Sequence, residues 1–275
     1  MKDLRGRVAV VTGGGSGIGR GMALALADEG MHVVIPDIEA DAAEKVASEV
    51  RERGVRGLAL RADVAQRREM EEVAERTYAE FGATHVLCNN AGVSLVGSLS
   101  ERTDADWEWA LSVNLYGVLH GIQAFLPRML AQGGDAHIVN TASIVGLMFA
   151  PGAGIYGTTK QALVGLSESL ATDLAPHGIG VSVVCPAGVR TRLTESARNR
   201  PAELVETRPD PAIEKIATDA INAGMDPLEV GRLVADAVRR NDLYVIPHPG
   251  AKPFVEQRFA QILAAFDAAA SRASS

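Results

Sequence analysis

The sequence RVAVVTGGGSGIGR, residues 7–20, decides the fold. It begins with a short apolar run that predicts a buried strand, and a helix-length segment follows the glycine-rich turn, up to about Glu29. Gly13 permits a tight turn, Gly17 allows the backbone to approach a ligand, and Gly19 allows a helix to pack closely on a strand. The stretch therefore predicts a strand, a tight turn and a helix in immediate succession.

A helix that begins directly after such a turn is a suitable anion site. Its first N–H groups have no partners within the helix, and the positive end of the helix dipole lies there. The spacing T-G-x-x-x-G-x-G differs from the G-x-G-x-x-G dinucleotide fingerprint. A glycine-rich loop without a ligand is the alternative, but the strand–turn–helix context favours binding. We predict that the phosphates of a dinucleotide bind to Gly13, Ser16, Gly17, Ile18 and Gly19.

Apolar runs of strand length alternate with amphipathic segments of helix length beyond this stretch. Strands are expected at 32–35, 56–60, 85–88, 136–140, 180–185 and 243–246. Helices are expected at 41–53, 69–81, 104–130, 155–175 and 228–240. This order predicts one doubly wound α/β domain over 1–275, with a parallel sheet of about seven strands covered on both faces. In the tail, apolar residues at 255–266 share a helical face, which we expect to pack on the core or on a second subunit.

Composition places the chain among ordinary globular proteins. It has 275 residues, 47% of them hydrophobic and 22% charged, and a formal net charge of −7. No basic stripe suggests nucleic acid, and no apolar stretch is long enough to suggest a membrane span or signal peptide. The two cysteines are expected to be free core thiols in a reducing cytoplasm. The scattered histidines predict no catalytic metal.

Asp37 follows the second expected strand. A carboxylate at this position can accept hydrogen bonds from both adenosine ribose hydroxyls and repels a 2′-phosphate. Because Ser16 and Ile38 bring no positive charge, we predict NAD rather than NADP as the cofactor; an ordinary turn residue is the alternative for Asp37. Further walls of the cofactor site are expected after the third and fourth strands, at Asp63, Val64, Asn90, Ala91 and Gly92.

Tyr156 and Lys160 stand four residues apart, on one face of an expected helix. An ammonium beside a phenol, together with an oxidised nicotinamide, would lower the pKa of the phenol and make it a usable base. A tyrosine and a lysine on one helix are more often surface residues. Ser143 changes this interpretation, because it follows a buried strand and is expected at the same edge of the sheet.

These motifs, in this order, resemble the short-chain dehydrogenase/reductase family over almost the whole chain, which implies a Rossmann fold. The resemblance implies that Ser143 binds the substrate oxygen and that Tyr156 exchanges its proton. It implies that Lys160 holds the nicotinamide ribose and lowers the pKa of Tyr156, while Asn114 positions a water that links Lys160 to solvent. It also adds cofactor contacts from the segment after the sixth strand, where Ala187 departs from the family's P-G-x-x-x-T: Pro186, Gly188, Val189 and Thr191.

The substrate is expected to be a small hydrophobic secondary alcohol or its ketone, covered by a lid at 193–227. This expectation rests on apolar residues predicted to line the pocket: Val93, Leu95, Val96, Ile144, Val145, Met148 and Leu193. The stretch 226–249, with the Trp-Glu-Trp at 107–109, also resembles bacterial Cα-dehydrogenases of benzylic alcohols. An NADPH-dependent ketoreductase and a non-catalytic dinucleotide sensor are the alternatives. The family resemblance further implies a homotetramer, or a dimer, with 104–130 and 155–175 at the subunit contact.

Overall fold

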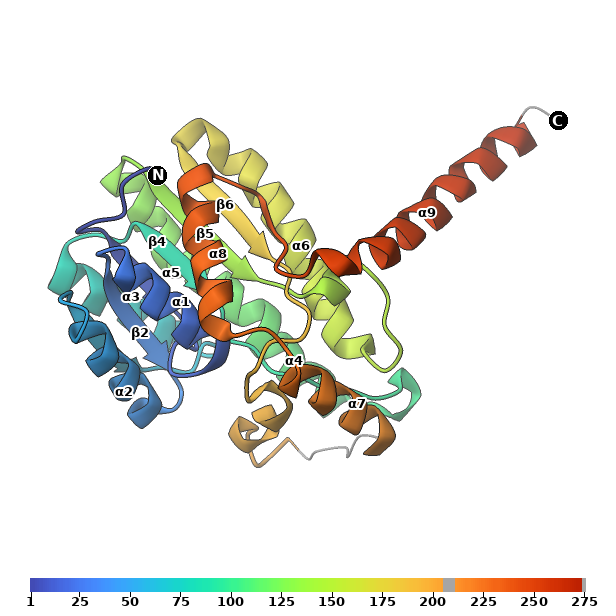
Figure 1. Ribbon diagram of the computed structural model, residues 1–275, viewed down its shortest axis with the longest axis horizontal. Helices are drawn as coiled ribbons and strands as arrows, with labels where there is room; N and C mark the ends of the chain where they lie inside the picture. The colour runs from blue at the N-terminus through green and yellow to red at the C-terminus, as the bar shows by residue number, and fades with distance from the viewer. Residues whose placement is uncertain (205–210, 274–275) are drawn as a thin grey trace.

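Seven parallel strands form the centre of the molecule, in the order β3-β2-β1-β4-β5-β6-β7 (Figure 1). The structure is a computed structural model that describes residues 1–204 and 211–273. The order reverses between β1 and β4, which are neighbours although β2 and β3 separate them along the chain. The strands are β1 (Val8–Val11), β2 (His32–Asp37), β3 (Gly57–Arg61), β4 (Val86–Asn89), β5 (Ala136–Thr141), β6 (Ile179–Val184) and β7 (Tyr244–Val245).

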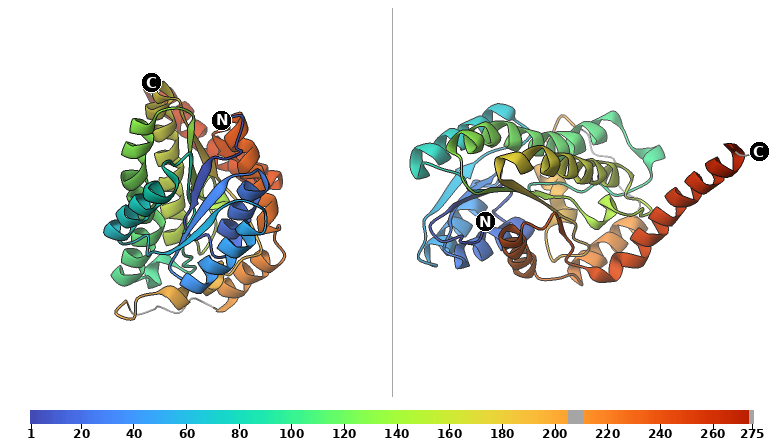
Figure 2. Two further views of the ribbon diagram at one scale, coloured as in Figure 1. Left: turned by 90° about the vertical axis from the view of Figure 1, so that its left-hand side faces the viewer. Right: turned by 90° about the horizontal axis from the view of Figure 1, so that it is seen from above.

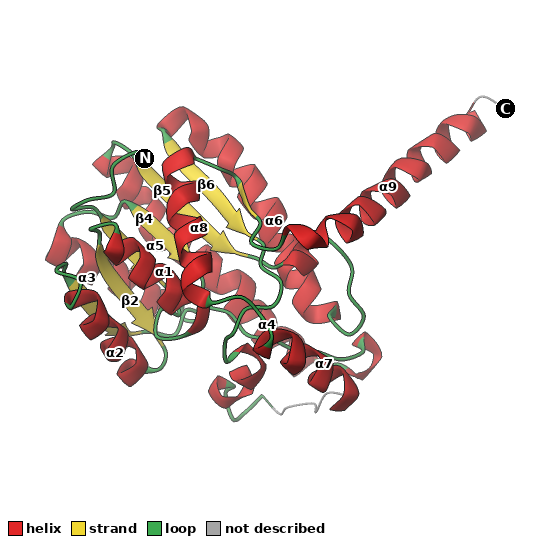
Figure 3. Ribbon diagram, viewed as in Figure 1, coloured by secondary structure: helices red, strands yellow, loops and turns green. Residues whose placement is uncertain are grey.

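Helices cover both faces of this sheet (Figures 2 and 3). One face packs on α1 (Gly17–Asp28), α2 (Ala40–Arg51) and α8 (Pro227–Arg240). The other face packs on α3 (Arg67–Phe81), α5 (Gly117–Gln132) and α6 (Gly154–Leu174). Outside these layers lie α4 (Asp104–Leu111), α7 (Pro211–Asn222), α9 (Lys252–Ala273) and the short helices η1 (Leu99–Glu101), η3 (Ile144–Gly146), η4 (Ala175–His177), η5 (Leu193–Asn199) and η6 (Pro249–Ala251).

The alternating side chains of β1 explain why its sequence is apolar throughout. Ala9 and Val11 pack on the helices of one face, while Val8 and Val10 pack on the helices of the other. Successive side chains of a strand point to opposite faces, so a strand buried on both faces needs a continuous apolar run. The predicted doubly wound α/β fold is confirmed.

Two glycines bring α1 and α8 into direct backbone contact. A Cβ atom added at Gly21 would lie 2.1 Å from the carbonyl oxygen of Pro227, and one added at Gly231 would lie 2.2 Å from that of Gly21. The helices cross without intervening side chains. This contact fixes the start of α8 against the helix that begins at the glycine-rich turn.

Three segments differ from the sequence-based expectations. The helix expected over 104–130 is interrupted by one π-helical turn, η2 (Ser112–Tyr116). The polar stretch 193–227 contains the helices η5 and α7, and its residues 205–210 lie outside the described part of the chain. The tail forms α9, which projects away from the other layers (Figure 1). No helix in the described ranges is long and apolar enough to cross a membrane.

Candidate active site

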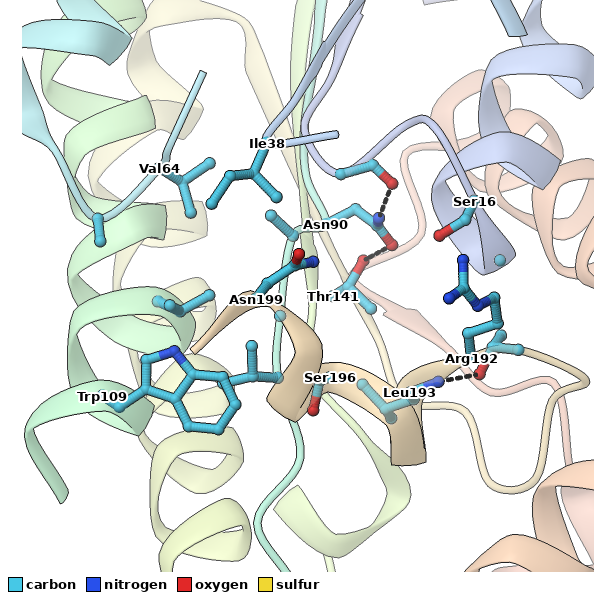
Figure 4. Close-up of a pocket in the computed structure, with 18 of the residues that line it drawn as sticks. Ser16, Ile38, Val64, Asn90, Trp109, Thr141, Arg192, Leu193, Ser196 and Asn199 are labelled. Carbon is cyan, nitrogen blue, oxygen red and sulfur yellow. Dashed lines mark hydrogen bonds between the residues drawn. The ribbon is translucent and has the colours of Figure 1, made fainter. Parts of the chain in front are cut away.

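A cavity of about 400 Å³ opens at the carboxyl edge of the sheet, where the strand order reverses. Ligands of doubly wound sheets bind in this crevice. The glycine-rich turn forms one part of its wall, and Trp109 on α4 forms another (Figure 4). Residues of η5 close the cavity from the side of the predicted lid, with Leu193, Ser196 and Asn199 facing it.

The glycine-rich turn has the geometry that the sequence predicts. Gly13 has a φ of +61°, and a Cβ atom there would lie 2.8 Å from the Cα atom of Ala91. Gly17 has a φ of +51° and lies against Thr191. Larger residues would be strained at both positions and would fill the turn. Gly19 does not line the cavity; its added Cβ would lie 2.2 Å from the carbonyl oxygen of Gly13, so its role is close packing.

The N-terminus of α1 remains suited to an anion. The side chain of Ser16, the N-cap residue, makes no capping hydrogen bond, and the first turn of α1 carries no acidic residue. The positive end of the helix dipole is therefore not neutralised by an acidic residue of its own first turn. Together with the glycine turn, this end of α1 fits the pyrophosphate of a dinucleotide.

Thr12 and Asn90 join the ends of three strands beside this turn. The Thr12 hydroxyl accepts hydrogen bonds from the N–H groups of Asn90 at 2.9 Å and Ala91 at 3.1 Å. The amide of Asn90 donates to the carbonyl of Thr12 at 3.0 Å and accepts from the Thr141 hydroxyl at 3.3 Å. These bonds fix the edge of the sheet at which Asn90, Ala91 and Gly92 face the cavity.

Asp37 lies at the end of β2 with its carboxylate held in place. Its Oδ2 accepts the N–H of Gly15 at 2.8 Å, and its Oδ1 accepts the N–H of Glu39 at 2.9 Å. Burial raises the pKa of Asp37, and the two backbone hydrogen bonds oppose that rise. Each oxygen retains further lone pairs, so the carboxylate can still accept a ligand hydroxyl. Asp63 and Val64, after β3, line the same cavity.

The side chains of Ser143, Tyr156 and Lys160 come together at the cavity that the glycine turn lines. Ser143 follows β5 and donates to the carbonyl of Pro186 at 3.3 Å. Tyr156 and Lys160 lie on α6, and the Lys160 Nζ is 5.5 Å from the centre of the Tyr156 ring. Lys160 donates to the carbonyl of Thr141 at 2.9 Å. The structure thus places phenol, hydroxyl and ammonium in one site.

In the protein without a cofactor, burial is the main cause of the shifted pKa values of Tyr156 and Lys160. It raises the pKa of Tyr156 to about 12, and a hydrogen bond with Ser143 only partly opposes that rise. It lowers the pKa of Lys160 to about 8. The expectation that Lys160 and an oxidised nicotinamide together lower the pKa of Tyr156 stays a prediction, because in the protein without a cofactor the loss of hydration dominates. A further positive charge in the cavity is needed before the phenol can ionise readily.

The buried ammonium leads to a stability prediction. The folded pKa of about 8 lies below the ordinary 10.5, so the unfolded chain binds more protons between these values. The free energy of unfolding therefore rises with pH through this window. We expect Lys160→Met to raise Tm at pH 7, by roughly 2–4 °C for each kcal/mol of relief, and this advantage to shrink by pH 10.

Calorimetry of wild type and Lys160→Met from pH 7 to 10 measures this difference. Lys45→Met, on the exposed side of α2, is the matched control. A Tm advantage of Lys160→Met that stays constant over the window would contradict the buried, easily deprotonated ammonium.

The π-helical turn η2 brings Asn114 to the base of the site. Its Oδ1 accepts the N–H of Val93 at 2.8 Å, and its Nδ2 donates to the carbonyl of Val93 at 3.0 Å and the Thr159 hydroxyl at 3.1 Å. π-helical turns often occur at functional sites because they redirect one side chain. Asn114 does not line the cavity, and its link to solvent through a water stays a prediction.

Two backbone hydrogen bonds join the segment that follows β6 to Met225, which lies just before α8. Met225 donates to the carbonyl of Gly188 at 3.0 Å, and Arg190 donates to the carbonyl of Met225 at 3.0 Å. Gly188 does not line the cavity, contrary to its predicted cofactor contact; an added Cβ would lie 2.3 Å from the carbonyl oxygen of Ala220. Pro186, Ala187, Val189 and Thr191 do line it. Ala187 is exposed and has no positive φ, so its side chain brings no strain.

The wall of the substrate half differs from the prediction. Of the seven apolar residues expected there, only Val93 and Leu193 line the cavity, whereas Leu95, Val96, Ile144, Val145 and Met148 do not. Those five are close in sequence to the site residues, but Ile144 and Val145 belong to η3, and Leu95, Val96 and Met148 lie outside the helices and strands. The wall is formed instead by residues far apart in the chain, among them Trp109, Val113, Ala142, Leu204 and Ile221.

A buried ion pair holds this wall together. The carboxylate of Asp106, fully buried on α4, accepts a hydrogen bond from the Arg200 guanidinium at 2.7 Å. The same guanidinium lies over the Trp109 ring, 5.1 Å from its centre, and donates to the carbonyl of Leu204 at 2.7 Å. Sequence reasoning missed Asp106 and Arg200, because 94 residues separate them.

A second tie joins η5 to the adenosine end of the cavity. Glu39 accepts hydrogen bonds from Arg198 at 2.7 Å and from Asn199 at 3.0 Å, and its other oxygen lies 3.8 Å from Arg192. Arg192 and Arg198 line the cavity near Asp37, so positive charge does reach this end. The prediction considered Ser16 and Ile38 alone and overlooked these arginines, which Glu39 pairs.

The family model described as short chain dehydrogenase matches residues 7–202. The chain belongs to the short-chain dehydrogenase family. The family model therefore spans the glycine turn, the Ser143–Tyr156–Lys160 group and the start of the predicted lid. This family consists of oxidoreductases. The glycine-rich turn, with Gly13 and Gly17, and the N-terminus of α1 fit a nicotinamide dinucleotide.

Individual relatives support the same family. The chain is 35% identical over 266 residues to C alpha-dehydrogenase of Sphingobium sp., covering 96% of this chain and 87% of that protein. It is 32% identical to CLA biosynthesis dehydrogenase/reductase of Lactiplantibacillus plantarum, covering 96% and 95%. A solved short chain dehydrogenase/reductase from Burkholderia phymatum, in complex with NAD, is 36% identical with a TM-score of 0.92, covering 95% of this chain and 96% of that one.

Proposed function

We propose that this short-chain dehydrogenase uses NAD to interconvert a hydrophobic secondary alcohol and its ketone. The observation that carries the proposal is the shared cavity of Ser143, Tyr156, Lys160 and the glycine turn. When bound, the dinucleotide supplies the acceptor or donor of the hydride and, in its oxidised form, a positive charge. Segment 193–227 serves as a lid, supported by Leu193, Ser196, Leu204 and Ile221 in the cavity wall.

In the proposed oxidation, the chain's own groups handle the proton. The substrate oxygen would lie between the oxygens of Ser143 and Tyr156, and Tyr156 in its deprotonated form would accept the hydroxyl proton, while a bound dinucleotide would supply the hydride acceptor. Lys160 lies beside Tyr156 as an ammonium, and its pKa of about 8 allows it to release and regain a proton near neutral pH. In reduction the same groups act in reverse, and Tyr156 returns the proton to the substrate oxygen.

The preference for NAD is assigned to Asp37. We expect Asp37→Ala to weaken NADH binding by about 10- to 100-fold, because a charge-assisted hydrogen bond contributes roughly 1.5–3 kcal/mol. NADPH binding should strengthen at the same time, because a carboxylate no longer faces the 2′-phosphate. Fluorescence titration of both cofactors measures the ratio of their Kd values. Asp41→Ala, on the exposed side of α2, is the control; an unchanged ratio in Asp37→Ala would remove Asp37 from this role.

An NADPH-dependent reductase is the second candidate, because Arg192 and Arg198 could bind a 2′-phosphate. Glu39 already pairs with both guanidiniums, and Asp37 adds a second negative charge, so NAD remains favoured. Tighter binding of NADPH than of NADH to wild-type protein in the same titration would establish the second candidate instead.

The proposed substrate class follows from the cavity wall and from the relatives. Trp109 presents an aromatic wall, and the identity to a C alpha-dehydrogenase makes a benzylic alcohol the first choice. A panel of aliphatic, steroidal and benzylic secondary alcohols, followed by NADH absorbance, tests it. Turnover of benzylic alcohols ahead of the others is expected, and no turnover across the panel in either direction would contradict the enzyme assignment. Assembly as a homotetramer or dimer stays a prediction of the family resemblance.

A further inference from the structure

Helix α9 leaves the body of the molecule after its first two turns. In two views at right angles it extends as a single rod beyond the helical layers (Figures 1 and 2). Its base is held where Arg258 donates to the carbonyl of Gly146 at 3.2 Å and lies over the Phe149 ring, 5.1 Å from its centre. Every residue of α9 after Arg258 is exposed. The outer part of the helix therefore packs on nothing within the described chain.

Helix α9 carries a continuous apolar stripe, which starts at the half-buried Val255 near its base and runs along the exposed part. The α9 stripe consists of Val255, Phe259, Ile262, Phe266, Ala269 and Ala273. These residues follow one another at intervals of four, three, four, three and four, the 3.5-residue repeat of a helix seam that packs on another helix. Leu263 widens the stripe on one side, and Phe266 and Leu263 are 71% and 63% exposed.

A single helix with such a stripe is not expected to stand alone in water. Its 22 residues give a rod of about 33 Å, and isolated helices gain most of their stability from packing an apolar face. Large exposed apolar stripes mark interaction sites. Because the Arg258 contacts fix the base, the outer half cannot fold back onto its own body without breaking them.

We propose that the α9 stripe packs against the α9 stripe of a second copy of this chain. The stripe contains no charged residue that would repel a copy of itself, and a two-fold contact uses the same surface twice. Its three large exposed side chains, its alanines and the adjoining Leu263 would bury about 1,000 Å² over the pair, which is about the minimum for a specific interface. The small alanines at the outer end allow the two helices to approach closely.

The proposed contact lies away from the cavity and does not depend on the cofactor or substrate. Arg258 and Phe149 connect its base to η3, directly after Ser143. A paired α9 would therefore contact η3, the short helix that follows Ser143, through Arg258. Activity and assembly can be measured separately, so the failure of one proposal leaves the other standing.

Engineered cysteines test the contact directly. Both natural cysteines are buried, so a cysteine placed on α9 is the accessible thiol of the described chain. Ile262→Cys puts a thiol in the stripe, and Ala264→Cys puts one on the opposite side of the same turn. Under mild oxidation of dilute protein, Ile262→Cys should form a disulfide-linked dimer in high yield and Ala264→Cys should not. Equal yields in the two variants would overturn the proposal.

Light scattering provides the second readout. Phe259→Glu combined with Phe266→Glu should reduce the particle mass by half, whereas Gln261→Glu should leave it unchanged. NADH binding by each variant shows that its body is folded. A wild-type mass equal to that of one chain, or an equal mass for wild type and the double variant, would overturn the proposal.

Discussion

Tyr156→Phe should lower kcat by roughly 1,000-fold or more, which is the upper range for loss of a general acid–base group. The nearest other hydroxyl, that of Ser143, lies in the same cavity but is an aliphatic alcohol, a much weaker acid than a phenol, and it donates to the carbonyl of Pro186, so it cannot replace Tyr156 in proton transfer. Phenylalanine fills the same space and removes one oxygen. The variant should therefore keep its fold and its affinity for NADH, measured by fluorescence titration beside the turnover assay.

Thr158→Val is the matched control for this prediction. Thr158 lies two residues away on the exposed side of α6, where its hydroxyl donates to the carbonyl of Gly154. Its kcat should stay within a factor of about two of wild type. If Tyr156→Phe retains most of the wild-type kcat, the proton passes through another group and the assignment of Tyr156 fails.

Asp106→Ala should be the most destabilising of the substitutions considered. It removes a fully buried carboxylate from the Arg200 guanidinium, and breaking such a pair costs about 3–5 kcal/mol. It also removes the capping box of α4, in which the Asp106 carboxylate accepts the N–H of Thr103 at 3.1 Å. A fall in Tm of about 10 °C follows, since 1 kcal/mol corresponds to roughly 2–4 °C in a chain of this size.

Thermal unfolding of Asp106→Ala beside Asp104→Ala measures this effect. Asp104 is exposed in the first turn of the same helix, so its loss should change Tm by only a degree or two. A similar small change for Asp106→Ala would mean that the Arg200 pair contributes little. The KM for substrate should also rise in Asp106→Ala, because Arg200 no longer holds the Trp109 wall.

Local patterns predicted the fold and the centre of the site. The β1–turn–α1 stretch, Asp37 and the Tyr156–Lys160 spacing each express their structure within a few residues, because strand alternation, left-handed glycines and helix periodicity are local properties. The order of the strands then brings them to one edge. Ser143 could be placed in advance because it directly follows a buried strand.

Features that depend on distant partners could not be predicted in this way. Arg198 reaches Glu39 across 159 residues, and the wall at Trp109 is completed by Leu204 and Ile221. The π-helical turn at Asn114 leaves the apolar periodicity of its surroundings almost unchanged, so the sequence favoured one continuous helix. The upward shift of the pKa of Tyr156 in the protein without a cofactor could not be predicted either, because the spacing reveals the neighbouring lysine but not how completely the fold excludes water from the phenol.

The bridge between Gly188, Arg190 and Met225 joins the two ends of the chain segment that separates β6 from α8. The chain departs from the body at Arg190 and returns at Met225, and hydrogen bonds hold these two points together. The segment between them begins and ends at the same place, so a change in its length costs little in loop closure, whereas Arg198 and Arg200 tie its described part to Glu39 and Asp106. A replacement segment would therefore have to supply new partners for Glu39 and Asp106 as well as the same two end points.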